Sequence, residues 1–292
     1  MKKTKSNAWS TISGFLPSCT LFRSIFLFLG ITAMFAITAV PVWGQDAETA
    51  LSDKTLMAVF AHPDDEGTVG PILKKYADRG VNVILVIATD GRLGTNEYNN
   101  LPPGDSLAAI RRGEMQCAAD RLGVDLIHLE YEDQFNAEEG YDGFIPQSRG
   151  FIKEFHRIVS ENRPDAILTW GPDGGSNHID HRLVGATVTQ VLLSTEWEQT
   201  PEVYYVGSPA SQIENEESRI LRGVQDKYLT MRIPYTDADG EVAMRAMQCH
   251  ESQFPPERVE KWWRERQGER ENLVYLRPFE APEGEISNEL FE

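Results

Sequence analysis

Two short polar clusters in the sequence contain residue types that bind divalent metals. The first contains His62, Asp64 and Asp65 and lies in the segment AHPDDEG. It follows an apolar run that ends at Ala61, and charges buried at such a point need compensation, because an uncompensated buried charge is costly. A divalent cation provides it, and histidine with carboxylate is a common zinc ligand set. Taken alone, this cluster is equally consistent with a solvated acidic turn.

The second cluster lies far downstream and contains His178, Asp180 and His181 in the segment GPDGGSNHIDH. Two histidines three positions apart at a helix start face the same way. The glycines before them let the backbone approach a ligand closely. An ordinary helix cap is the alternative for this segment alone. Two such clusters, each at the end of a strand of the same sheet, instead indicate a shared metal site.

The elements that must position these clusters are predicted from the apolar pattern. Strands are expected at 56–61, 81–89, 125–131 and 166–170. Helices are expected at 67–79, 105–122, 149–162 and 179–194. Strands separated by helices predict βαβ units in a mostly parallel, doubly wound α/β sheet with helices on both faces. Sites in such sheets form at the carboxyl ends of strands, so we expect the two clusters and the segment TDGR at 89–92 to converge.

The remainder of the chain is less regular, and we interpret it as completing the same domain, 54–280. Expected strands lie at 202–206, 228–233 and 272–279, and expected helices at 240–253 and 256–267. A polar linker, 46–53, precedes the domain, and an acidic tail, 281–292, follows it.

The first 45 residues resemble a secretory signal peptide. Four basic residues, the last of them Arg23, precede an apolar run from about Ser24 to Val40. This run is near the length that spans a bilayer, so an uncleaved N-terminal anchor is the competing interpretation. In either case we expect the domain to be secreted or periplasmic.

The charge of the chain excludes one class of partner. After residue 45 the chain holds 24 basic and 45 acidic side chains, a formal charge of −21. Such a surface repels phosphate backbones and anionic lipid head groups. We therefore expect no nucleic-acid partner and no membrane contact beyond the possible N-terminal anchor.

Two cysteines, Cys117 and Cys249, follow the predicted signal. Two cysteines this far apart do not make a disulfide scaffold, although they could pair in an oxidising compartment. Cys117 lies among apolar residues of a predicted helix, so we expect it to be a small buried thiol.

Three motifs together resemble the PIG-L/LmbE-like family of zinc-dependent N-acetylglucosaminide deacetylases, which have a Rossmann-like fold. They are AHPDDE after the first strand, TDG after the second and GPDGGSNHIDH after the fourth. The resemblance spans Leu56 to His181, with a weaker echo at His250–Gln253. It implies a hydrolase that uses one Zn²⁺ per chain to remove the acetyl group from an N-acetylated amino sugar, free or within an oligosaccharide.

The resemblance also implies a division of roles. The implied metal ligands are His62, Asp65 and His181. Three protein ligands leave a position for water, as catalytic zinc requires. Asp64 would be the general base for that water, and His178 would stabilise the oxyanion or assist the leaving amine. Asp180 would orient a histidine.

The implied substrate contacts are Arg92, Arg111, His250 and Gln253. Arg92 stands where the family often has an acidic residue after TxG, which leaves the contacts of that loop open. Arg111 resembles the start of an RxxE helix motif, and a surface ion pair worth about 0–1 kcal/mol is its alternative. The segment CHESQ resembles a family HxSQ segment, and a surface histidine at a helix end is the alternative for His250.

Two other functions fit the same residues. One is a metal-dependent amidase acting on a non-sugar N-acyl amine, and the other is a non-catalytic carbohydrate-binding protein on the same fold. The complete set of predicted metal ligands and base favours an enzyme. Nucleotide binding is disfavoured, because no GxGxxG follows the first strand. The sequence leaves open the N-acyl substrate, the choice among zinc, iron and manganese, and the oligomeric state.

Overall fold

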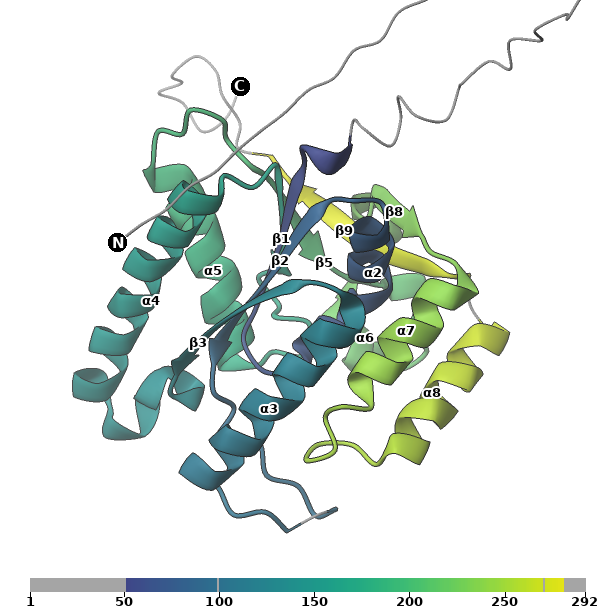
Figure 1. Ribbon diagram of the computed structural model, residues 1–292, viewed down its shortest axis with the longest axis horizontal. Helices are drawn as coiled ribbons and strands as arrows, with labels where there is room; N and C mark the ends of the chain where they lie inside the picture. Colours follow the sequence, from purple (N-terminus) through teal and green to yellow (C-terminus); the bar gives the residue numbers. More distant parts are fainter. Residues whose placement is uncertain (1–50, 99, 270, 281–292) are drawn as a thin grey trace, which may run out of the picture. The chain divides into compact units, whose positions relative to one another are not determined.

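A computed structural model describes residues 51–98, 100–269 and 271–280. Its main sheet has seven strands in the order β3-β2-β1-β4-β5-β9-β8 (Figure 1). The five parallel strands are β1 (Thr55–Phe60), β2 (Asn82–Thr89), β3 (Asp125–Tyr131), β4 (Ala166–Trp170) and β5 (Glu202–Val206). The two antiparallel strands are β8 (Met231–Pro234) and β9 (Leu273–Phe279). The predicted mostly parallel, Rossmann-like α/β fold is confirmed.

Helices cover both faces of this sheet (Figure 1). One face carries α2 (Gly70–Asp78), α3 (Asp105–Leu122) and α7 (Asp237–Met247), with α8 (Pro256–Glu269) against α7. The other face carries α4 (Tyr141–Asn162) and α5 (Ile179–Ser194). Successive side chains of a strand point to opposite faces. Leu56, Ala58 and Phe60 of β1 therefore pack in the first core and Met57 and Val59 in the second.

Most predicted elements match, and the differences have local causes. The bounds of β3, β4, α5 and β5 are as predicted, whereas α4 begins at Tyr141 and α7 ends at Met247. The strand predicted at 228–233 begins later in the structure, as β8 at Met231, because a short 3-10 turn occupies Asp226–Tyr228. Two short strands, one short helix and several 3-10 turns were not predicted; the strands and the helix are β6 (Ser208–Pro209), β7 (Gly223–Val224) and α6 (Glu216–Arg222). They are too short to show a periodic apolar pattern.

The ends of the chain lie outside the described residues. The predicted signal segment, most of the predicted linker and the acidic tail fall there. Among the helices that the structure describes, none is both long enough and apolar enough to span a bilayer.

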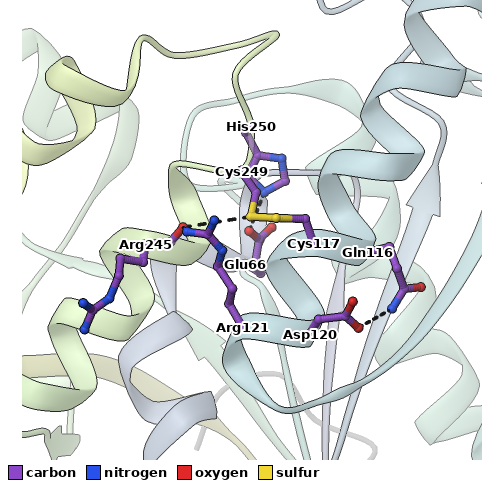
Figure 2. The surroundings of a disulfide bond; sticks show 8 residues. All are labelled: Glu66, Gln116, Cys117, Asp120, Arg121, Arg245, Cys249 and His250. Atoms are coloured by element: carbon purple, nitrogen blue, oxygen red, sulfur yellow. Dashed lines mark hydrogen bonds and ion pairs between the residues drawn. A yellow bond between two sulfur atoms is a disulfide. The ribbon is translucent and has the colours of Figure 1, made fainter.

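A disulfide joins Cys117 of α3 to Cys249, which follows α7, with their Cα atoms 5.9 Å apart (Figure 2). The expectation of a free buried thiol at Cys117 is therefore wrong, and the pairing left open for the two cysteines occurs. The contact between α3 and α7 brings together residues separated by 132 positions.

Replacing both cysteines with serine should lower the free energy of unfolding by about 2–4 kcal/mol, because the cross-link closes a long loop in the unfolded chain. Urea unfolding of the wild type and the double variant, with and without reductant, measures this. Reductant should destabilise the wild type alone. Equal stability of the two proteins without reductant would contradict the prediction.

Candidate active site

The carboxyl ends of β1 and β4 bring the two polar clusters together. His62 follows β1, and His181 lies in the first turn of α5, which follows β4. Because β1 and β4 are parallel neighbours, both chain segments leave the sheet at the same edge. His62 Nδ1 lies 3.1 Å from His181 Nε2. The predicted convergence of the clusters is confirmed.

Asp65 completes a group of three potential ligands with these histidines. Its Oδ1 lies 3.1 Å from His181 Nε2, and its Oδ2 lies 3.6 Å from His62 Nδ1. In a tetrahedral zinc site with bonds of about 2.0–2.2 Å, the ligand atoms are roughly 3.3–3.6 Å apart. The two distances to Asp65 end on different oxygens, and Oδ2 also accepts hydrogen bonds from the backbone N–H groups of Ala61 and His62, so Oδ1 is the oxygen left for a cation. Its 3.1 Å distance to His181 Nε2 and the 3.1 Å distance between the two histidine nitrogens are close to those around one cation. Burial raises the pKa of Asp65, but the hydrogen bonds with His181 and His62 outweigh it and hold that pKa far below its usual value.

The hydrogen bonds on the outer side of each ring determine which nitrogen faces Asp65. His181 Nδ1 lies 2.7 Å from the carbonyl oxygen of Gly174 and donates to it, so Nε2 keeps its lone pair. His62 Nε2 lies 3.0 Å from Asp180 Oδ2 and donates to it, so Nδ1 keeps its lone pair. With a cation bound, both imidazoles would be neutral, and they would direct these two lone pairs, together with the Asp65 carboxylate, to a common position. This donor set fits a divalent cation.

Asp180 and Asp133 hold His62 from the side away from Asp65. Asp180 Oδ2 also accepts a hydrogen bond of 2.8 Å from the backbone N–H of Gln134. Asp133 Oδ1 lies 3.3 Å from His62 Nε2. Burial lowers the pKa of His62, but its hydrogen bonds to Asp133, Asp180 and Asp65 raise that pKa well above its usual value. The histidine that Asp180 contacts is His62.

Asp133 is absent from the predicted site, although one signal points to it. It lies just after Tyr131, the last residue of β3, and therefore at the carboxyl end of a parallel strand. The sequence there, YED, carries only a carboxylate pair and no histidine, so the pattern alone does not separate it from an acidic turn.

In the described part of the chain, two groups of three residues bring one potential ligand atom each within 4.8 Å of one another; both contain His62 and neither contains Asp65. These groups are His62–His178–His181 and His62–Asp133–Asp180. In the second group, His62 would bind through Nε2, the nitrogen that faces Asp180, and not through Nδ1, the nitrogen that faces His181. His181, by contrast, lines an open cleft, where a bound cation would keep a position for water.

His178 caps α5 and packs against the rings of the other two histidines. Its Nδ1 accepts a hydrogen bond of 3.3 Å from the backbone N–H of Asp180. Its ring centroid is 4.6 Å from that of His62 and 5.1 Å from that of His181. Burial and the neighbouring His62 lower the pKa of His178. The neutral ring keeps Nε2–H as a donor. Its catalytic role stays a prediction.

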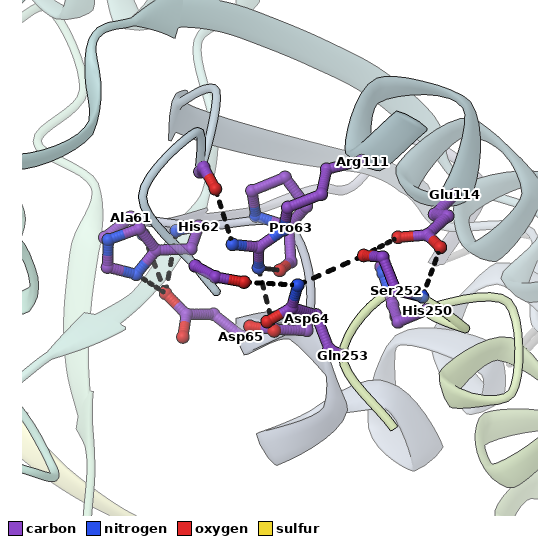
Figure 3. Close-up of polar contacts among 12 residues, drawn as sticks. Ala61, His62, Pro63, Asp64, Asp65, Arg111, Glu114, His250, Ser252 and Gln253 are labelled. Atoms are coloured by element: carbon purple, nitrogen blue, oxygen red, sulfur yellow. Dashed lines mark hydrogen bonds and ion pairs between the residues drawn. The ribbon is translucent and has the colours of Figure 1, made fainter. Parts of the chain in front are cut away.

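Asp64 lies between His62 and Asp65 in the sequence, but its carboxylate is paired with Arg111, whose Nη2 lies 2.8 Å from Asp64 Oδ2 (Figure 3). Burial raises the pKa of Asp64 to about 6, although the charge of Arg111 acts to lower it. The Asp64 side chain is 18% exposed, and a carboxylate that water can reach and whose pKa lies near neutrality suits a general base.

Arg111 does not lie on a substrate-facing surface, because its side chain is only 3% exposed. Its guanidinium donates to the carbonyl oxygens of Gly91, at 2.9 Å, and Pro63, and to the Asp64 carboxylate (Figure 3). Arg111 therefore holds the loop that carries Asp64, and the geometry does not support its predicted contact with a sugar.

The other predicted substrate contacts also have partners within the protein. Arg92 pairs with Asp90, with 2.7 Å between Nη2 and Oδ2. Gln253 donates to the carbonyl oxygen of Gly94 at 2.8 Å. His250 is 0% exposed, so the predicted substrate contact of His250 is wrong, and so is the alternative of a surface histidine. Arg92 and Gln253 are partly exposed, so burial contradicts the predicted substrate contact of His250 but not theirs.

A cleft of about 640 Å³ opens beside His181. The ring of His181 stacks in parallel on Trp170, with 4.5 Å between centroids. Polar side chains line the cleft farther out, among them Gln212, Asn215, Arg222 and Tyr275. Such groups can form hydrogen bonds with the hydroxyls of a sugar.

Solved structures with the same fold include proteins of different activity. One is N,N'-diacetylchitobiose deacetylase from Pyrococcus horikoshii, with a TM-score of 0.57 and 24% identity, covering 77% of this chain and 84% of that one. Another is GalB, the 4-carboxy-2-hydroxymuconate hydratase from Pseudomonas putida KT2440, also with a TM-score of 0.57 but 15% identity, covering 80% of this chain and 100% of that one. At these identities the similarity shows the fold alone.

Sequence comparison is more specific. Residues 57–192, which include both polar clusters, match the family model described as PIG-L: GlcNAc-PI de-N-acetylase. Diacetylchitobiose deacetylase of Thermococcus kodakarensis is 30% identical over 219 residues, which cover 72% of this chain and 73% of that protein. Because the match to the Thermococcus protein extends over most of both chains and the family model spans both polar clusters, this chain belongs to the PIG-L family.

Proposed function

We propose that this protein is a zinc-dependent deacetylase that hydrolyses the acetamide of an N-acetylglucosamine-type sugar. The observation that carries the proposal is the convergence of His62 Nδ1, His181 Nε2 and the Asp65 carboxylate at one edge of the sheet. The names of the matching family and of the Thermococcus relative both describe removal of acetyl groups from glucosamine compounds.

In this proposal His62, Asp65 and His181 hold the cation. When bound, zinc would lower the pKa of a water molecule and polarise the acetamide carbonyl. Asp64 accepts the proton of the attacking water, and Arg111 keeps that carboxylate in place through its 2.8 Å ion pair. His178 directs Nε2–H towards the reacting amide, where it donates to the carbonyl oxygen or to the leaving amine.

We place the remainder of the substrate in the cleft beside His181. The cleft meets the proposed metal site at His181, the one proposed ligand that lines it. Its polar side chains suit sugar hydroxyls better than an apolar acyl amine. This favours an amino sugar over the non-sugar amide of the alternative amidase function.

Acetate release tests the reaction. The purified protein, with its metal content measured and after reconstitution with zinc, should release acetate from N-acetylglucosamine or N,N'-diacetylchitobiose and not from Nε-acetyllysine. Release from acetyllysine alone would favour a non-sugar amidase. Sugar binding without release, after reconstitution with zinc, iron and manganese in turn, would favour a carbohydrate-binding protein.

We also propose that the domain is exported. The support is the signal-like composition of residues 1–45 and the disulfide between Cys117 and Cys249, since stable disulfides form mostly in oxidising compartments. N-terminal sequencing of the mature protein distinguishes cleavage from anchoring, because a retained Met1 would indicate an uncleaved anchor.

A further inference from the structure

We infer that Glu66 and His250 form a positioning pair that fixes the orientation of Asp64, an inference that rests on the proposed role of Asp64 as the base. Neither residue faces the cleft or the proposed metal position. Glu66 acts on Asp64 through the backbone amide, and His250 acts through Glu66.

The first observation is the backbone of Asp64. It has φ 105° and ψ −18°, a left-handed conformation that non-glycine residues rarely adopt. Such a conformation persists only where its surroundings determine it, and it is concentrated at functional sites. The contacts that hold Asp64 in this conformation therefore also determine where its carboxylate points.

The second observation is the contact that holds this backbone. The N–H of Asp64 donates to Glu66 Oε2 at 3.0 Å. The other oxygen of the same carboxylate, Oε1, lies 2.7 Å from His250 Nε2. Glu66 and His250 are both 0% exposed. A carboxylate this deeply buried needs a partner, and His250 is placed to compensate its charge.

The third observation concerns the other contacts of His250. Within the part of the chain that the structure describes, His250 Nδ1 is buried without a hydrogen-bond partner, so the imidazole is committed to Glu66. The residue before it, Cys249, is tied to α3 by the disulfide, and Figure 2 shows His250 and Glu66 beside that bond. The backbone that carries His250 is thus covalently tied to α3 through the preceding residue.

Together these contacts fix Asp64 at two points. Arg111 holds its carboxylate, and Glu66 holds its backbone amide. A displacement of a reacting group by about 1 Å can cost roughly 100-fold in rate. Loss of the Glu66 contact would free the backbone to leave its left-handed conformation, and the carboxylate would move with it.

The test compares Glu66→Ala and Glu66→Gln in the full-length, zinc-reconstituted protein. The alanine variant should lower kcat about 10- to 100-fold, with KM and zinc content unchanged. The glutamine variant keeps a side-chain oxygen that can accept from the Asp64 amide, so it should restore most of kcat. Hydrogen exchange of the peptide containing Asp64 should show lost protection in the first variant and retained protection in the second.

Asp165→Ala is the matched control. Asp165 Oδ2 accepts a hydrogen bond of 2.8 Å from the backbone N–H of Thr55, at the opposite end of β1. The control therefore loses a comparable contact between a carboxylate and the backbone, far from Asp64. It should retain kcat and exchange protection at Asp64, even if its thermal midpoint falls as far as that of Glu66→Ala.

Three outcomes would overturn the inference. The first is an alanine variant of Glu66 with the kcat of the control. The second is a glutamine variant that is as inactive as the alanine variant. The third is zinc loss in either variant, which would make Glu66 part of the metal site. A wild type that binds zinc but releases no acetate would refute the proposed function instead, and amide exchange would still show whether Glu66 holds the Asp64 backbone.

Discussion

Asp64→Asn should lower kcat by about 10²–10⁴-fold while the zinc content stays that of the wild type. The asparagine side chain keeps the shape of the carboxylate and an oxygen that can accept from Arg111, so the loop should not move. It cannot take a proton from water, however. The carboxylate of Asp64 faces Arg111, and the three atoms that converge on the proposed cation belong to other residues.

Asp65→Asn is the control for this result, because the two residues are adjacent but have different contacts. Asp65 lies 3.1 Å from His181 Nε2, so its variant should lose zinc as well as activity. Steady-state kinetics and elemental analysis of the same preparations measure both effects. Full activity in the Asp64 variant would refute its role as base, and zinc loss there would show that Asp64 is a ligand.

His181→Gln should weaken zinc binding by at least about 100-fold and reduce turnover to background. Changes to groups that only support a ligand already cost about 10–100-fold in metal affinity. His181 supplies one of three donor atoms, and its ring is held at the correct angle by the Gly174 carbonyl and by Trp170. Glutamine cannot reproduce the rigid imidazole that these contacts orient.

Competition with a chromogenic chelator measures this affinity. His156→Gln is the matched control, since His156 is another histidine beside an indole ring, Trp197 at 5.4 Å, but lies on α4 away from the cluster. It should bind zinc as the wild type does. Unchanged affinity in the His181 variant would place the cation instead between His62, Asp133 and Asp180, which form the neighbouring group of possible ligands.

The two halves of the proposed site were predictable because they depend on local sequence and on one property of parallel sheets. An apolar run followed by AHPDDE, and a second strand followed by GPDGGSNHIDH, place their polar residues at strand ends. Parallel strands leave the sheet at a common edge, so His62 and His181 meet without any information about individual contacts. The long strands and helices follow from periodicity in the same way.

Tertiary structure alone decided which polar side chains face the cleft and which are buried. Arg111 and His250 carry the same residue types as substrate contacts, but they are buried against Asp64 and Glu66. Gln253 is partly exposed and donates to the carbonyl oxygen of Gly94. The partner of each lies more than a helix away in the sequence, and periodicity within one element contains no information about such a partner.

Dependence on elements that are distant along the chain also explains why the sequence alone did not predict the disulfide or the short elements. Cys117 and Cys249 pair because α3 packs on α7, which depends on how the second half of the chain returns to the first face of the sheet. The sequence by itself determined the elements and the edge at which the site forms. The tertiary structure decided the hydrogen-bond partners, because burial depends on elements that are distant along the chain.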